Sequence, residues 1–244
     1  MGKEVAKKEV LLPQATIKGR GFEHAIDKKD LIIPRAKLLQ DLSPEVKDEN
    51  STLKPGQIIN SLSREILPIT FIPLFWSPTW IRFNPRNKED RGYDPNYERG
   101  ALIWMSRDPN DPRVLEEGEF GNNGESPLAT KFINFFSIFI GHPMPIIVSF
   151  SKTSMKAGQR LLSLAKLTGG DMFGKRYNLT SKLMHKNNNN FYVLEATPIG
   201  LVANDSKEFK VSEILYNNYN EKPIEVHDIE NIEEEKVVDV GSGA

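Results

Sequence analysis

The stretch that decides the fold is residues 131–167, KFINFFSIFIGHPMPIIVSFSKTSMKAGQRLLSLAKL. Residues 131–140 and 146–150 are dominated by aromatic and β-branched side chains, a composition typical of strands. The Gly-His-Pro connection between them is short and turn-prone, so the two runs predict an antiparallel hairpin. In residues 154–167 apolar side chains recur at helical spacing, which predicts a helix.

Further β-prone runs lie on both sides of this stretch. They are residues 31–40, 56–62 and 69–83 before it and residues 175–183 and 191–197 after it, with a short closing helix expected at 211–219. From residue 69 onward the order is strand, strand, strand, helix, strand, strand, with an insertion after the first strand, which is the element order of an OB-fold. We therefore expect a mainly β, α+β chain. Its centre would be a five-stranded OB-fold-like barrel with a helix between strands 3 and 4 and a long insertion after strand 1.

The remaining segments differ from this core in composition. Residues 84–127 contain five prolines, many Asn, Asp and Gly residues and one apolar island at 101–105, so we expect a long excursion from the core. Residues 1–30 are expected to be a basic flexible arm, or simply a solvated N-terminus. Residues 31–220 would form one OB-fold-like domain that contains this excursion, and residues 221–244 a disordered acidic tail.

Several classes of protein and site are disfavoured by the composition. The chain has no cysteine, which excludes disulfides, thiolate zinc sites and cysteine nucleophiles and fits a cytoplasmic location. No secretory signal is visible, and the longest apolar stretch, residues 66–83, is broken by prolines, so no membrane association is expected.

Recognisable catalytic motifs are also missing from the sequence. There is no GxxxxGK[ST] loop, GxSxG elbow, HExxH or GxGxxG, and the four histidines are scattered. The acidic residues of the excursion could gather around a cation, but no spacing matches a calcium loop. We expect no enzyme activity, no cofactor and no metal.

A basic stretch covers residues 150–186, with eight basic residues against Asp171 alone, a net charge of +7. Such local charge attracts phosphates and releases counterions on binding. The alternative is a solvated helix face beside a charged edge strand. The predicted phosphate contacts are Lys152, Lys156, Arg160, Lys175, Arg176 and Lys182.

Aromatic residues lie close to arginines elsewhere in the chain. Single-strand binders use flat rings for base stacking and cations for the backbone, while many of these rings must also be core. The alternation in residues 131–140 predicts one packed face and one that meets a ligand or the insertion. The remaining predicted DNA contacts are Trp76, Trp80, Arg82, Arg86, Trp104 and Tyr177.

The end of the sequence is acidic. Residues 221–239 hold eight acidic and two basic residues, a net charge of −6, interspersed with Ile and Val. Such a tail can occupy a basic groove until DNA displaces it, or offer a handle to partner proteins. The alternative is a disordered end that only keeps the protein soluble.

An ordered series of short motifs resembles phage-encoded single-stranded DNA-binding proteins. The motifs are IPRAKLLQ at 33–40, GQIINSL at 56–62, FIPLF at 71–75, SFSKTSMKAG at 149–158 and KRYNLTSK at 175–182. The resemblance implies an OB-fold that coats single-stranded DNA during phage replication or recombination, without catalysis. It also implies that the acidic tail recruits phage or host replication and recombination proteins.

Two other functions remain open at this stage. The chain could be a phage structural or assembly protein that makes protein contacts through its insertion and arms. It could also be an enzyme acting on DNA, although no carboxylate constellation supports that. Whether it forms a homo-oligomer is not decided by the sequence.

Overall fold

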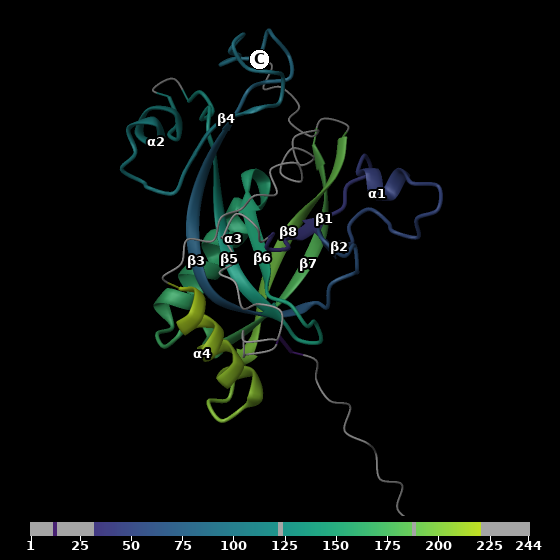
Figure 1. The fold of residues 1–244 in the computed structure, drawn as a ribbon, viewed down its shortest axis with the longest axis vertical. Coiled ribbons are helices and arrows are strands. Elements are labelled where there is room, and N and C mark those ends of the chain that lie inside the picture. Colours follow the sequence, from purple (N-terminus) through teal and green to yellow (C-terminus); the bar gives the residue numbers. More distant parts are fainter. Residues whose placement is uncertain (1–11, 14–31, 122–123, 187–188, 221–244) are drawn as a thin grey trace, which may run out of the picture.

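The computed structural model describes residues 12–13, 32–121, 124–186 and 189–220 (Figure 1). The predicted arm and tail therefore lie almost entirely outside the described residues. The chain is mainly β, of the α+β class, with antiparallel sheets, as expected. Its elements are β1 (Ala36–Leu38), α1 (Pro44–Lys47), β2 (Ile58–Asn60), β3 (Thr70–Phe83), β4 (Leu102–Ser106), α2 (Pro112–Glu117), β5 (Thr130–Phe139), β6 (Ile146–Ser151), η2 (Lys152–Ser154), α3 (Met155–Leu167), η3 (Met172–Gly174), β7 (Lys175–Lys186), β8 (Asn189–Leu201) and α4 (Lys207–Tyr219).

The main sheet has the order β6-β5-β3-β7-β8, with β4 added on β3. If β4 is set aside, β7, β3, β5 and β6 are the fourth, first, second and third strands, which is the spatial order of a Greek key. Helix α3 lies between the third and fourth of them, as predicted. The sheet is not closed into a barrel, because β6 and β8 end the path and no ladder joins them among the described residues. The prediction that the strands close into a barrel is therefore wrong.

The two-stranded β1–β2 unit spans the opening between β6 and β8. On one side the backbone N–H of Ile147, in β6, donates to the Pro34 carbonyl at 2.9 Å. On the other side the Gln40 side chain donates to the Tyr192 carbonyl of β8 at 2.9 Å and accepts from the Tyr192 N–H at 2.8 Å. A backbone hydrogen bond on the β6 side and two hydrogen bonds of the Gln40 side chain on the β8 side thus take the place of the strand ladder that would close a barrel.

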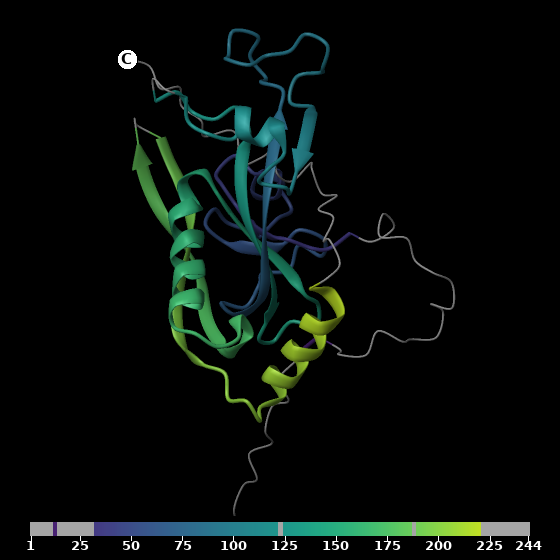
Figure 2. The ribbon, with the colours of Figure 1, turned by 90° about the vertical axis from the view of Figure 1, so that its left-hand side faces the viewer.

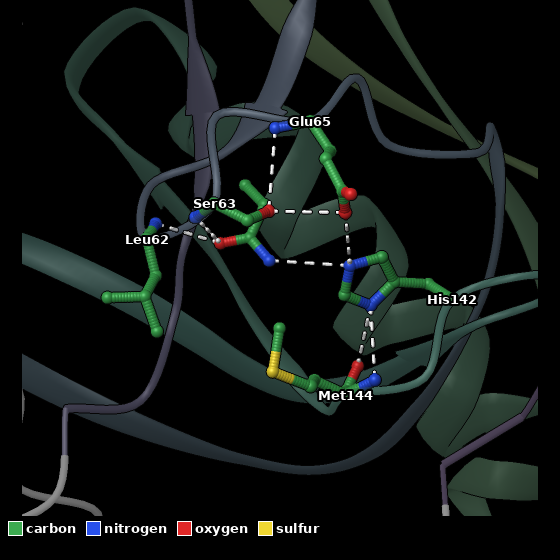
Figure 3. A network of polar contacts seen from close by, with 6 residues as sticks. Leu62, Ser63, Glu65, His142 and Met144 are labelled. Atoms are coloured by element: carbon green, nitrogen blue, oxygen red, sulfur yellow. Dashed lines mark hydrogen bonds and ion pairs between the residues drawn. The ribbon is translucent and has the colours of Figure 1, made fainter.

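A buried histidine fastens the turn after β2 to the turn between β5 and β6 (Figure 3). The Asn60 Oδ1 accepts from the backbone N–H groups of Leu62 at 2.8 Å and Ser63 at 3.3 Å. Its Nδ2 therefore donates to His142 Nε2, 3.3 Å away. On its other side the ring Nδ1 lies 3.1 Å from the Met144 carbonyl oxygen and 3.2 Å from the Met144 backbone nitrogen, so both ring nitrogens have polar partners.

Both faces of β5 are buried. Of the two alternatives expected for its second face, a ligand or the insertion, the structure shows the insertion, since Leu102 and Met105 of β4 pack against the cluster on that side. Phe135 and Phe139 belong to the core cluster on one side of the sheet, with Leu161 of α3. Phe132 and Phe136 belong to the cluster on the other side, which α4 covers. Because two helices pack on opposite faces of the sheet, both sets of rings lose their contact with water.

Helix α3 forms where the periodicity predicts it. Its close approach to β6 depends on Gly158, because a Cβ there would lie 2.6 Å from the Cβ of Phe150. Ser154, at the N-cap position, makes no capping hydrogen bond; its Oγ instead accepts from the Leu194 N–H of β8 at 3.0 Å. Helix α4 starts earlier than predicted, with Ser206 as a true cap whose side chain accepts from the Phe209 N–H.

The predicted excursion is more ordered than a loop. Its apolar island forms β4, which pairs with the far end of β3, and α2 follows. Asn84 is completely buried at its base; its Nδ2 donates to the carbonyls of Asp94, Tyr97 and Glu98, and its Oδ1 accepts from the Asp94 N–H. In the described part of the chain no group of three or more His, Asp and Glu side chains could hold a metal ion.

The last two strands are longer than the runs expected at 175–183 and 191–197, because β7 continues to Lys186 and β8 begins at Asn189. Among the described residues no helix is long and apolar enough to cross a membrane.

Candidate functional site

The basic stretch of the sequence lies on two neighbouring elements, α3 and the β7–β8 hairpin. Leu161 of α3 and Leu194 of β8 share one core cluster, and the Ser154–Leu194 hydrogen bond joins the start of the helix to the hairpin. Figure 2 shows the helix lying against the hairpin on one side of the molecule. The fold therefore gathers charges that are spread over more than thirty residues of sequence.

A row of cations runs along the start of this helix. Lys152 lies in the η2 turn just before the helix, and Lys156 and Arg160 lie four residues apart on one face of α3; all three are exposed. No acidic residue occurs in residues 151–170. Like charges at this spacing destabilise a helix by roughly 0.2–0.5 kcal/mol per pair, so a bound polyanion would relieve the repulsion. We call these three residues the cation row.

Lys175 has a different role. Its side chain is buried, and its Nζ donates to the carbonyls of Ala165 at 2.9 Å and Gly169 at 2.7 Å. These carbonyls lie at the C-terminal end of α3, where backbone acceptors lack partners within the helix. Lys175 therefore holds the end of the helix against β7 and does not present its charge to solvent.

The other predicted residues of β7 are divided between surface and core. Lys182 is exposed, with its Nζ 3.7 Å from a Glu195 carboxylate oxygen, and Arg176 is half-buried. Tyr177 is fully buried against Phe71, with ring centroids 5.8 Å apart, and burial raises the pKa of its hydroxyl. In this conformation Tyr177 is not accessible to a base.

Trp76 is the most exposed of the three tryptophans, at 41%. It lies on β3 opposite Phe135, in a segment with an unusual environment. Strand β7 pairs with β3 only at residues 70–71, and β4 pairs with it only from Trp80 onward. Between these points, among the described residues, β3 has a neighbour on one edge only. Trp76 is thus a ring beside an open strand edge.

Trp80 and Trp104 are buried, at 4% and 8% exposure, in a cluster that supports α2. The Lys131 Nζ lies 5.0 Å from the Trp80 ring centroid, and the Arg113 guanidinium lies 5.2 Å from that of Trp104. The Trp104 indole N–H also donates to a Glu117 carboxylate oxygen at 2.7 Å. These rings already have cationic and anionic partners within the chain.

The two predicted arginines of this region are also divided. Arg82 is 6% exposed; its Nη2 donates to the Gly92 carbonyl at 2.6 Å, and its Nε is 3.7 Å from Glu117. Arg86 is on the surface of the insertion. The structure therefore brings Trp80, Arg82 and Trp104 together, but as support for the insertion.

A pocket lies between β1, β6, η2 and β8, and it was not expected from the sequence. Its lining is rich in hydroxyl groups and includes two rings and one cation: Leu38, Gln40, Ser149, Ser151, Lys152, Thr153, Ser154, Phe191 and Tyr192. Lys152 has a φ of 44°, in the left-handed region that is unfavourable for a side chain other than glycine. The available signal was the SFSKTS run at 149–154, which noticeably concentrates hydroxyls around one lysine.

Comparison with known proteins identifies a family without a stated activity. No curated protein matches the chain, and no solved structure does. The model of the Pam3 phage gp34-like protein family matches residues 4–225, which is most of the chain. This match confirms that the chain is a phage protein, as the sequence resemblance implied. The chain belongs to the Pam3 phage gp34-like protein family.

Proposed function

We propose that this protein is a sequence-nonspecific single-stranded DNA-binding protein that coats and protects DNA during phage replication or recombination. The observation that carries the proposal is the cation row of Lys152, Lys156 and Arg160, exposed and without an acidic residue in residues 151–170. A row of exposed cations binds a phosphate backbone without reading its sequence. The role is non-catalytic.

The strand order supports an OB-fold-like reading of the domain. The OB-fold is a partly open Greek-key barrel, and the order of β7, β3, β5 and β6 is a Greek key. Oligonucleotides bind OB-folds on the face of strands two and three and at the loops after strands one and four. Here those loops correspond to the insertion and to the tip of the β7–β8 hairpin. Both faces of β5 are packed, so the proposal relies on the edges and the hairpin side.

Within this proposal the predicted residues have distinct tasks. The cation row and Lys182 follow phosphates, and Trp76 stacks on a base, a contact that contributes roughly 1–3 kcal/mol. Arg86 and Arg176 are at or near the surface and remain proposed backbone contacts. The buried set, Trp80, Arg82, Trp104, Lys175 and Tyr177, supports the surface from behind.

The acidic tail completes the proposal. Its net charge of −6 is opposite to that of the basic stretch at 150–186, which is the support for competition with DNA. Its interspersed Ile and Val residues suit it to bind phage or host replication and recombination proteins.

The test is a fluorescence titration with oligo-dT at several salt concentrations. Replacing Lys152, Lys156 and Arg160 with Glu should weaken binding and lower the salt slope by about 2, since each lost phosphate contact removes about 0.7 on single strands. The matched control replaces three exposed lysines elsewhere, Lys47, Lys54 and Lys210, with Glu, so the net charge changes equally. An equal loss in both variants would contradict a specific role for the cation row.

The wild-type protein is tested first, because its behaviour decides whether the proposed function stands. Absence of salt-sensitive binding at micromolar protein would overturn the proposed function. A large, defined oligomer that is indifferent to DNA would favour the structural or assembly role instead.

A further inference from the structure

Helix α2 and the residues after it carry an exposed patch that combines apolar and acidic side chains. Leu115 is 61% exposed and Phe120 is 70% exposed. Glu116 and Glu119 lie between them, also exposed, and neither makes an ion pair or hydrogen bond with another described residue in the structure. Large apolar side chains left in water beside charges commonly mark an interaction surface. We call these four residues the acidic patch.

Helix α2, which carries part of the acidic patch, is anchored to the rest of the insertion. Val114, one residue before the patch, is 2% exposed and packs with Trp80 and Trp104. Asp111 accepts from the Arg113 backbone N–H at the start of α2, and the Arg113 side chain lowers the pKa of the Asp111 carboxyl well below its usual range. Since α2 is anchored by its other side, Leu115 and Phe120 are not needed for the core.

The β7–β8 hairpin presents the complementary chemistry. Lys182, Met184 and Lys186 alternate along β7, so they project from the same face of the strand. All three are exposed, and Met184 is 38% exposed. The ion pair of Lys182 with Glu195 is at the surface and contributes at most about 1 kcal/mol, so it does not prevent another contact. We call these three residues the basic patch.

The two patches do not meet within one chain. Figures 1 and 2 both place α2 and the free end of the β7–β8 hairpin on separate arms at the same end of the molecule. We propose that the acidic patch of one copy binds the basic patch of a second copy. Two carboxylates would face two ammonium groups, with Leu115 and Phe120 against Met184.

This contact is head to tail, because it joins different surfaces of identical chains. Such heterologous contacts continue into an open row unless the geometry closes a ring. The patches are small, so the contact between free molecules is weak. The inference goes beyond the proposed function, since the contact itself requires no DNA.

The absence of cysteines allows a direct test. Two single-cysteine proteins, Leu115→Cys and Met184→Cys, are mixed without DNA at low salt and treated with a short bifunctional maleimide. The mixture should give a crosslinked dimer several-fold faster than either protein alone. The control pairs Leu115→Cys with Lys47→Cys, an exposed position on α1. A rate for the mixture equal to that of this control would overturn the inference.

Charge exchange provides the second arm. Adding Glu116→Lys and Glu119→Lys to the Leu115→Cys protein should abolish the excess crosslinking. Adding Lys182→Glu and Lys186→Glu to the Met184→Cys protein should then restore it. Failure of the restored pair, with all proteins folded by circular dichroism, would contradict direct pairing of the two patches. Because no DNA is present, this result is independent of the oligo-dT titration.

Discussion

Two regions of the molecule use similar residue types in opposite ways. One is the insertion with the end of β3 that supports it, and the other is the side formed by α3 and the β7–β8 hairpin. In the first region, Trp104 and Arg82 share Glu117, and Arg113 and Lys131 lie over the two indole rings. Along α3, the cation row is exposed and no acidic residue lies nearby in sequence. Rings and cations that contact one another in the interior support structure, whereas exposed cations are accessible to a ligand.

The largest effect is expected from removing the buried ring of Trp80, which supports the insertion. Trp80→Ala should lower the free energy of unfolding by about 3–5 kcal/mol, because it empties a buried site behind α2. Trp76→Ala, at an exposed ring on the same strand, is the matched control and should cost less than about 1 kcal/mol. Urea unfolding measures both, and equal losses would contradict the division between the two tryptophans.

A second test separates two lysines within the basic stretch. Lys175→Met should destabilise the protein by about 2 kcal/mol, because the carbonyls of Ala165 and Gly169 at the end of α3 lose a charged donor. Lys156→Met, on the exposed side of the same helix, should leave thermal stability nearly unchanged. If Lys156→Met proves the more destabilising of the two, the structural role assigned to Lys175 is wrong.

A third test concerns the one exposed tryptophan. Trp76→Ala should weaken oligo-dT binding by about 1–2 kcal/mol, in the lower part of the range for loss of one base–ring stack. The salt slope should stay the same, since no phosphate contact is removed. Unchanged affinity would remove Trp76 from the proposed site while leaving the cation row untouched.

The smallest effect is expected from the tail. Deleting residues 222–244 should tighten oligo-dT binding several-fold at low salt, because an acidic competitor for the basic side is lost. The gain should shrink as salt screens the attraction. A truncated protein that binds exactly as the full chain does would leave the tail with partner recruitment alone.

The element order could be predicted because each element has a local signal. The alternation in β5 and β6 and the helical spacing in α3 are visible in short windows of sequence. Residues 69–83 were expected to be one β segment despite their prolines, and strand β3 runs from Thr70 to Phe83. Pro78 is tolerated because that part of β3 has a partner on one edge only among the described strands.

Closure of the sheet could not be predicted in the same way. Whether the third and fifth strands pair depends on what lies between their edges. Here the β1–β2 unit fills that space, held by Gln40 on Tyr192, two residues 152 positions apart in sequence. The sequence also did not predict that the insertion is ordered. Its base is held by the buried side chain of Asn84, which the sequence does not distinguish from the other asparagines of the segment.

By itself the sequence determined the strands, the main helix, the phage-type motifs and the places where charge accumulates. It also excluded every role that requires a thiol. Only the tertiary structure decided which rings and cations face water. Lys152 and Lys175 belong to the same basic stretch, but only Lys175 is covered, by the end of α3. The physical reason is that exposure is set by contacts between elements distant in sequence, whereas charge and periodicity are properties of the local chain.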